Sequence, residues 1–332
     1  MRTIASTSRE SIEGSSGRQD ATPASLCKTD PRLARFAWFV VSYNVAVILW
    51  GALVRATGSG AGCGSHWPLC NGEILPTSAK IQTLIEFTHR VTSGLSLVLM
   101  AILLVWCWRR TAKGAWARYS CVVAAILLFN EALLGAMLVL FEYVGLDQSA
   151  SRVVFLCLHF GNTLLLVAAL VLTAQWLSKG ERRFVVTPKR HERIVILFGL
   201  VCVMVTGMTG TLAALGDTIF PAASLRGGLT QDFSSNSHVL LRLRFLHPVV
   251  AAVAFSYVLW MAQKLSKDRD ESSRLLPLLT MTILAQVGLG VLNVLLLAPI
   301  WLQITHLFVA EMFWIMMVLA SSEVLIKNPA SL

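Results

Sequence analysis

The sequence predicts an all-α membrane protein whose eight transmembrane helices form two pseudo-twofold-related four-helix bundles. Three observations lead to this fold class. The chain of 332 residues is 55% hydrophobic and only 14% charged, with a mean hydropathy of +0.67. It contains eight apolar runs near the length of about 20 residues that crosses a hydrocarbon layer about 30 Å thick. Histidines also recur at matching places in the two halves of the chain.

The predicted spans follow one another with short connections, and each is expected to be helical because lipid offers no partners to backbone polar groups. They are residues 36–56, 82–107, 116–141, 153–177, 194–215, 239–263, 275–298 and 301–325. We expect an N-terminal bundle at 36–178 and a C-terminal bundle at 194–326, joined by a cytoplasmic linker at 179–193. Residues 1–35, rich in Ser, Gly and Thr, are predicted to be a disordered cytoplasmic tail.

The net charge of +10 is distributed unevenly along the chain. Lys and Arg are concentrated in the N-terminal tail and in three alternate loops, at 109–118, 179–193 and 264–274. The positive-inside rule places these loops and both termini in the cytoplasm. This distribution argues against a nucleic-acid partner and for a lipid bilayer. No cleavable signal or transit peptide is expected, so a bacterial inner membrane is the predicted location.

Four histidines mark an internal repeat of four helices. In the first half, E-F-T-H ends at His89 and L-C-L-H ends at His159. In the second half, R-F-L-H ends at His247 and Q-I-T-H ends at His306. Repeats of the same topology are related by an axis along the membrane normal. A second matching pair of motifs, E-A-L-L-G at Glu131–Gly135 and Q-V-G-L-G at Gln286–Gly290, lies between the histidines of each half.

The histidine positions predict two haem sites. Neutral imidazole is an apt axial ligand for haem iron. All four histidines lie a few residues after the start of spans that begin on the outer side, so we expect them at one depth near that surface. The predicted pairs are His89 with His159 and His247 with His306. A packing role for each histidine is one alternative; a zinc site is another, but it lacks the usual cysteines or carboxylates.

Charged residues near the outer ends of the spans are candidate haem contacts. Arg55, Arg90, Arg242 and Arg244 are predicted to bind haem propionates, because Arg makes bidentate contacts with carboxylates. The alternative is that these side chains extend to the aqueous interface.

Glu86 lies three residues before His89 on the same helical face, whereas Arg244 holds the equivalent position in the second half. An acid there can accept a proton or stabilise positive charge, so Glu86 is predicted to be catalytic. Its alternative role is an ion pair with Arg90 or Arg55. Glu131 and Glu311 also fall within spans, where acids are costly, but receive no assigned role.

Cys63 and Cys70 share the outer loop after the first span. That side of a bacterial membrane is oxidising, so a disulfide between them is favoured over a metal pair. A C-x-x-C-H motif for covalent haem attachment is absent from the sequence.

Two motifs resemble haem A synthase. The first is G-A-L-V-R-A-T-G-S-G-A-G-C-G-S-H-W-P-L-C-N-G at Gly51–Gly72, followed by E-F-T-H-R at Glu86–Arg90; the second is A-L-G-D-T-I-F-P at Ala214–Pro221. The resemblance extends from the first predicted span to the last. It implies an oxidoreductase that converts the C8 methyl group of haem O to a formyl group, making haem A for terminal oxidases.

The resemblance also implies a division of labour between the halves. The C-terminal half would hold haem b through His247 and His306. The N-terminal half would receive haem O through His89 and His159, with Glu86 assisting the oxidation. The expected partners are an enzyme that supplies haem O, such as haem O synthase, an electron donor that the sequence does not identify, and a second copy of the chain in a homo-oligomer.

Two other functions use the same features. A quinol-linked electron-transfer cytochrome with two haem b groups needs the four histidines, but neither the acid beside one pair nor the long outer loop. A transporter also commonly has internal repeats, but it usually has helices broken at mid-depth.

Overall fold

A computed structural model describes residues 30–77, 80–179, 190–266 and 275–325 of the chain. Every regular element in these segments is helical, and eight of the helices are long and apolar enough to span a membrane. The predicted all-α fold with eight spans is therefore confirmed, and the chain is a multi-pass membrane protein.

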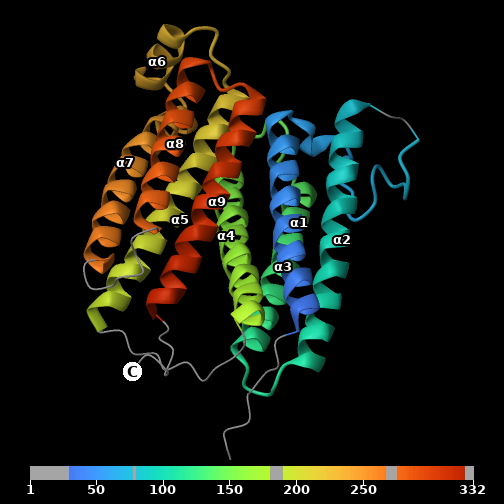
Figure 1. The fold of residues 1–332 in the computed structure, drawn as a ribbon. Helices are drawn as coiled ribbons and strands as arrows, with labels where there is room; N and C mark the ends of the chain where they lie inside the picture. The colour runs from blue at the N-terminus through green and yellow to red at the C-terminus, as the bar shows by residue number, and fades with distance from the viewer. Residues whose placement is uncertain (1–29, 78–79, 180–189, 267–274, 326–332) are drawn as a thin grey trace, which may run out of the picture.

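The helices are arranged roughly side by side in one bundle (Figure 1). The eight spanning helices are α1 (Pro31–Ala56), α2 (Ile81–Arg110), α3 (Trp116–Leu140), α4 (Ala150–Lys179), α5 (Arg190–Ile219), α7 (Val239–Ser266), α8 (Leu275–Leu295) and α9 (Ile300–Leu325). A single 3-10 turn, η1 (Ser59–Ala61), follows α1, and the short helix α6 (Leu225–Phe233) lies between α5 and α7. Both lie at the end of the bundle that is uppermost in Figure 1.

Two helices start four or more residues before the predicted position. Helix α1 begins at Pro31, so residues 31–35 belong to the helix rather than to the tail. The cause is local: the Asp30 side chain accepts hydrogen bonds from the backbone N–H groups of Arg32 and Leu33, and proline suits the first helical position. Helix α5 likewise begins at Arg190, inside the predicted linker. The rest of the predicted tail and linker, residues 1–29 and 180–189, lies outside the described residues.

Helix α6 was not predicted, because its sequence L-R-G-G-L-T-Q-D-F is short and has no apolar run. Its first turn is capped by Ser224, whose hydroxyl accepts a hydrogen bond from the backbone N–H of Gly227. Helix α6 packs against α7.

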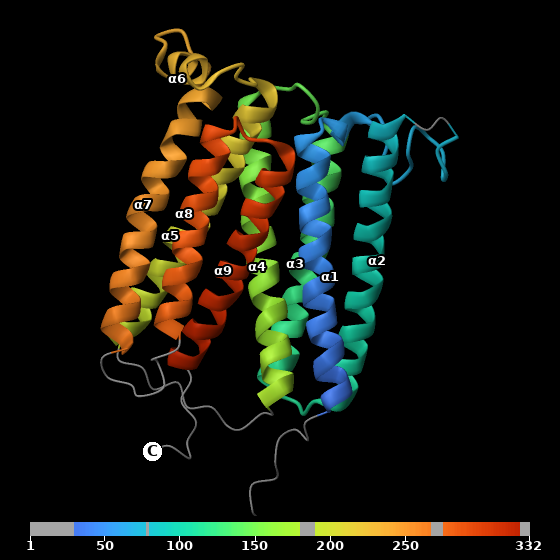
Figure 2. The ribbon, with the colours of Figure 1, turned by 45° about the horizontal axis from the view of Figure 1, so that its top comes forward.

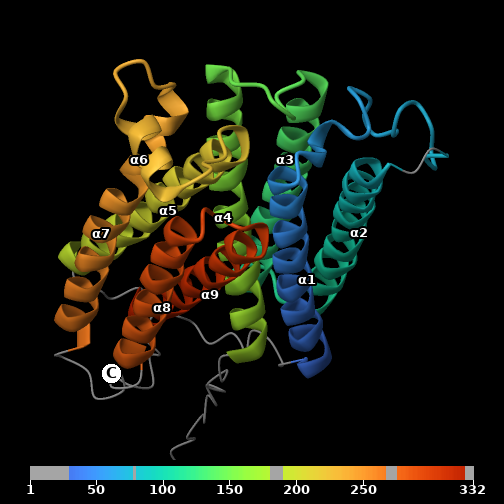
Figure 3. The same ribbon diagram turned by 90° about the horizontal axis from the view of Figure 1, so that it is seen from above.

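The first four spans form one group and α5, α7, α8 and α9 form the other, as the view from above shows (Figure 3). Between the groups, α4 packs against α5 and α9, and α1 packs against α9 and α5. A twofold relation that exchanges α1 with α5 and α4 with α9 converts the α4–α5 contact into the α9–α1 contact. The arrangement is thus compatible with the predicted pseudo-twofold axis.

Helix α4 lies at the centre of the molecule, beside α9 (Figure 2). It is the most enclosed span. In its most apolar stretch of 18 residues, 44% of the residues are buried, compared with 17–33% in the other spans. Two buried polar contacts join it to α9. The indole Nε1 of Trp314 donates to the carbonyl of Leu164 at 2.8 Å, and the Ser322 hydroxyl donates to Gln175 Oε1 at 2.6 Å. These contacts and the apolar core around them fix the two groups of helices against each other.

Candidate functional site

The four histidines occupy equivalent levels in the bundle. Each lies six to nine residues after the first residue of its helix, in α2, α4, α7 and α9. At about 1.5 Å of rise per residue, this places them about 9–14 Å from the helix starts. These four helices all begin at the end that carries α6 (Figure 1). The histidines therefore lie nearer to that end than to the opposite one.

The structure brings the histidines together as the predicted pairs. His89 is close enough to His159 for the two rings to interact electrostatically, and the same holds for His306 and His247. Each pair joins the second and fourth spans of one group. Ligation of iron by these imidazoles stays a prediction.

Each imidazole lies against a glycine of the span that precedes its own. A Cβ atom added at these glycines would approach the histidine Cε1 at 3.1 Å for Gly51 and His89, 3.7 Å for Gly135 and His159, 3.0 Å for Gly210 and His247, and 3.4 Å for Gly290 and His306. An added Cβ would therefore crowd the ring at Gly51 and Gly210, whereas at Gly135 and Gly290 it would make ordinary van der Waals contact. The same arrangement in both groups is independent support for the internal repeat.

The histidine surroundings fit a haem better than a bare metal ion. The Nδ1 atoms of His89, His159 and His306 are buried with no hydrogen-bond partner among the described residues, and His247 Nδ1 lies 3.2 Å from the Thr209 hydroxyl. The described residues contain no group of three or more His, Cys, Asp or Glu side chains placed to hold a metal ion by themselves. A porphyrin supplies four nitrogen ligands of its own, so two imidazoles in each half suffice.

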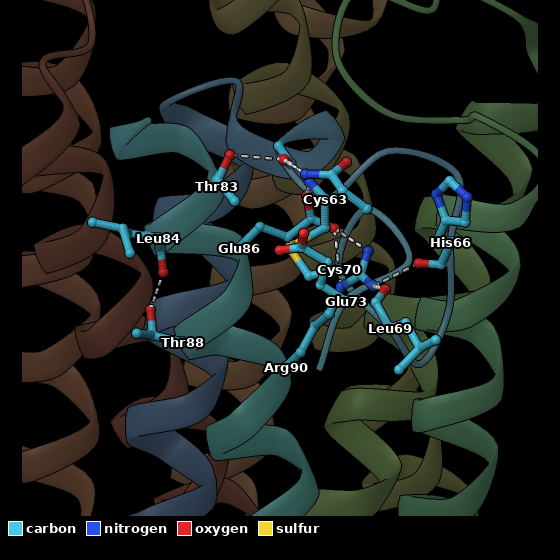
Figure 4. Close-up of a disulfide and its surroundings, with 12 residues drawn as sticks. Cys63, His66, Leu69, Cys70, Glu73, Thr83, Leu84, Glu86, Thr88 and Arg90 are labelled. Atoms are coloured by element: carbon cyan, nitrogen blue, oxygen red, sulfur yellow. Dashed lines mark hydrogen bonds and ion pairs between the residues drawn. A yellow bond between two sulfur atoms is a disulfide. The ribbon is translucent and has the colours of Figure 1, made fainter. Parts of the chain in front are cut away.

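Glu86 connects α2 to the loop that follows α1. Its side chain is buried, and its Oε2 accepts a hydrogen bond from the backbone N–H of Cys63 at 2.8 Å. Its Oε1 accepts from Arg90 Nε at 3.1 Å and from Arg90 Nη2 at 2.5 Å. Figure 4 shows both oxygens directed toward the loop and Arg90. The predicted alternative of an ion pair with Arg90 is confirmed, whereas a catalytic role for Glu86 stays a prediction.

Arg90 holds the far side of the same loop. Its Nη1 donates to the carbonyl of His66 at 2.6 Å and to that of Leu69 at 2.7 Å. Cys63 and Cys70 form the predicted disulfide across this loop. Residues 62–70 are thus attached to α2 at both ends (Figure 4).

The start of the loop packs closely on the first turn of α2. The Thr83 hydroxyl donates to the carbonyl of Gly62 at 2.8 Å. A Cβ at Gly62 would lie 2.6 Å from the backbone carbonyl of Gln82, so only glycine permits this approach. The glycine-rich motif at Gly51–Gly72 therefore serves two purposes: it leaves room for the His89 ring and it seats the disulfide loop.

Arg55 crosses from one group of helices to the other. Its Nη1 donates to the carbonyl of Ala214 at 2.6 Å and to the Thr218 hydroxyl at 2.9 Å, and its Nη2 donates to Gln303 Oε1 at 3.0 Å. Arg55 therefore links α1 to both α5 and α9.

Arg244 and Arg242 are also bound by protein groups. Arg244 forms ion pairs with Asp217, at 2.9 Å, and with Asp232. Arg242 donates to the Ser237 hydroxyl at 3.2 Å and to the carbonyl of Ser235 at 2.9 Å. All four arginines predicted to bind propionates thus have acceptors in the protein, and propionate binding stays a prediction. The motif at Ala214–Pro221 supplies acceptors for Arg55 and for Arg244.

The sequence did not connect Glu131 or Gln286 with a histidine. Glu131 Oε1 lies 3.1 Å from Nδ1 of His159, and Gln286 Nε2 lies 3.3 Å from Nε2 of His306. The signal was present in the matched motifs E-A-L-L-G and Q-V-G-L-G, whose first residues are these two. Their contacts depend on neighbouring helices and were not deducible from spacing alone.

Known proteins resemble most of this chain. The family described as "Cytochrome oxidase assembly protein" matches residues 34–318. The chain belongs to this COX15-CtaA family. Membership agrees with the sequence resemblance and covers every spanning helix, apart from a few residues at the first and last ends.

Individual relatives carry two different names. A protein of Thermus thermophilus named "Protoheme IX farnesyltransferase" is 40% identical over 301 residues, which are 89% of this chain and 48% of the relative. "Heme A synthase" of Alkalihalophilus pseudofirmus is 41% identical over 143 residues, covering 43% of this chain and 46% of the relative. "Heme A synthase" of an Exiguobacterium species is 28% identical over 284 residues, covering 85% and 90%.

The predicted resemblance to haem A synthase is therefore confirmed. The chain spans about half the length of the first two relatives, and nearly all of the third.

Proposed function

We propose that the protein is a haem A synthase, an oxidoreductase that converts the C8 methyl group of haem O to a formyl group for terminal oxidase assembly. The observation that carries this proposal is the repeated histidine pair at one level of both halves, in a chain of the cytochrome oxidase assembly family. The conversion removes two hydrogen atoms from the methyl carbon and adds one oxygen, which is a four-electron oxidation. We propose that it proceeds through successive oxidations and loss of water from a gem-diol.

The two halves would share the work unequally. In the N-terminal half, His89 and His159 hold haem O as the substrate. In the C-terminal half, His247 and His306 hold a resident haem b, which supplies one-electron redox chemistry when bound. Gly51 and Gly210 would leave room for the rings of His89 and His247. The contacts of Arg55 with α5 and α9 keep the halves at a fixed separation.

Glu86 is the residue proposed to assist the oxidation. It lies one helical turn from His89. Its carboxylate accepts a hydrogen bond from the loop at Cys63. Its hydrogen bonds to Cys63 and Arg90 hold the disulfide loop against the start of α2. Closure of that end would keep bulk water from the N-terminal site, and a carboxylate there can stabilise positive charge.

The location and partners follow from the same proposal. The chain would lie in a bacterial inner membrane with both termini in the cytoplasm and the histidines toward the outer side. Haem O would come from an enzyme that prenylates protohaem. The name of the Thermus relative, together with the half of its length that this chain does not match, supports a link between the two reactions.

The test is co-expression of the chain with a source of haem O, followed by chromatography of the extracted haems. We expect haem A and a hydroxylated intermediate, and Glu86→Ala should lower haem A while haem b stays bound. Haem b alone at both sites would instead identify an electron-transfer cytochrome. Production of haem O from protohaem and farnesyl diphosphate by this chain alone would also contradict the proposal.

A further inference from the structure

The two halves differ beside the second histidine of each pair. Glu131 in α3 and Gln286 in α8 are the first residues of the matched motifs E-A-L-L-G and Q-V-G-L-G. Each contacts the histidine of the following span, His159 or His306. At one equivalent position, therefore, one histidine has a carboxyl neighbour and the other has a neutral amide.

The carboxylate of Glu131 is held in place beside its histidine. Asn162 Nδ2 donates to Oε2 at 2.6 Å, and the Thr163 hydroxyl donates to Oε1. Asn162 is itself fixed, since its Nδ2 also donates to the carbonyl of Leu127 at 2.9 Å. The carboxylate therefore has little freedom to turn away from the ring of His159.

The ring nitrogen that faces this carboxylate is His159 Nδ1. Nδ1 of His159 and Oε1 of Glu131 are 3.1 Å apart. Nδ1 is buried and has no other partner among the described residues. Glu131 is consequently the acceptor available to it.

Gln286 makes a different contact. Its Nε2 donates to the backbone carbonyl of His306 at 3.2 Å and lies 3.3 Å from Nε2 of the ring. Nδ1 of His306 is buried, and the described part of the chain gives it no hydrogen-bond partner. Among the described residues, the C-terminal pair thus has no counterpart to the carboxylate of Glu131.

We propose that Glu131 is a positioning residue for the N-terminal site, where its carboxylate accepts the Nδ1 proton of His159 and makes this imidazole a stronger electron donor than His306. This inference rests on the proposed function, because it requires haem at both histidine pairs. Histidines that bind metals commonly donate their second N–H to a carboxylate or a carbonyl, which orients the ring and raises its basicity as a ligand. A more basic ligand, and a negative charge nearby, stabilise the oxidised iron. Glu131 would therefore give the substrate site the lower reduction potential.

A purely structural role for Glu131 is the competing explanation, because its contacts with Asn162 and Thr163 join α3 to α4. That role predicts that loss of the carboxylate weakens helix packing but leaves the electronic properties of bound haem unchanged. A reduction potential and a paramagnetic resonance spectrum distinguish the two explanations.

The experiment uses the full chain, purified with its haems, and a reciprocal exchange. Redox titration followed by optical absorption measures the midpoint of each haem, and His159→Ala and His306→Ala assign the midpoints to the two sites. We expect Glu131→Gln to shift the N-terminal midpoint to a more positive value and to change the largest g value of that ferric haem, while the other midpoint stays in place. Gln286→Glu should shift the C-terminal midpoint to a more negative value. Glu131→Asp, which keeps the charge, should restore the N-terminal midpoint at least partly.

Each outcome decides for or against the inference. Unchanged midpoints and g values in Glu131→Gln, with both haems bound, overturn it. If Glu131→Gln does not fold or retain haem, Gln286→Glu decides alone, and an unmoved C-terminal midpoint overturns the inference. Wild-type protein without haem in the N-terminal half also overturns it. Haem A formation, measured on the same preparations, separates the two proposals: active protein with unmoved midpoints refutes only the role of Glu131, whereas shifted midpoints without haem A refute only the synthase activity.

Discussion

Replacing Glu86 by alanine should release the disulfide loop from α2. The substitution removes the acceptor of the Cys63 backbone N–H, at 2.8 Å, and the partner that orients Arg90 toward the carbonyls of His66 and Leu69. A hydrogen bond to a charged group contributes about 1.5–3 kcal/mol. Since about 1.4 kcal/mol corresponds to a factor of ten, the Cys63 amide should exchange its hydrogen about 10- to 100-fold faster.

Hydrogen–deuterium exchange with mass spectrometry measures this effect on peptides that cover residues 57–77. Glu73→Ala is the matched control, because Glu73 lies in the same segment and its carboxylate accepts local hydrogen bonds from Thr77 rather than from the loop at Cys63. We expect faster exchange at Cys63 in Glu86→Ala, no such change in Glu73→Ala, and unchanged exchange in the middle of α2 in both. Wild-type exchange at Cys63 in Glu86→Ala would refute the reasoning, because the loop would then be held by other contacts.

Two further substitutions test the packing of the sites. Gly210→Ala places a Cβ 3.0 Å from Cε1 of His247 and should weaken or abolish the optical signal of one haem. In the control Gly288→Ala the added Cβ meets no atom within 4 Å, so both signals should stay intact. Equal spectra of the two variants would contradict the role of Gly210. Arg55→Ala removes three hydrogen bonds between the halves and should destabilise the protein by about 3 kcal/mol or more, measured as a lower melting midpoint in detergent. Arg226→Ala, at an exposed position, should leave the melting midpoint unchanged. An unchanged midpoint in Arg55→Ala would argue against a link between the halves through Arg55.

The fold was predictable because a membrane imposes a length on every apolar segment. All eight spans were identified from that constraint, and the shared outer loop indicated the Cys63–Cys70 disulfide. The helix ends were less accessible, since they depend on caps such as Asp30 before Pro31. Helix α6 was missed because it is stabilised by Ser224 and by contact with α7 rather than by its own hydrophobicity.

The histidine pairs were predictable for a different reason, namely that the repeat places equivalent residues at equivalent levels. The partners of the charged residues were not. Arg55 binds a carbonyl 159 positions later in the chain, and no periodicity signals such a contact. The same applies to Glu131, which was recognised as an acid within a span but could not be assigned to His159 without the packing of α3 on α4.

Extraction and chromatography of the haems bound to His159→Ala and His306→Ala test the division between the halves most directly. Both variants are purified from cells that supply haem O and protohaem. We expect His159→Ala to lose haem O and its oxidised products while it keeps haem b, and His306→Ala to show the opposite loss. The same ratio of haem types in both variants would contradict a substrate site and a resident haem in separate halves.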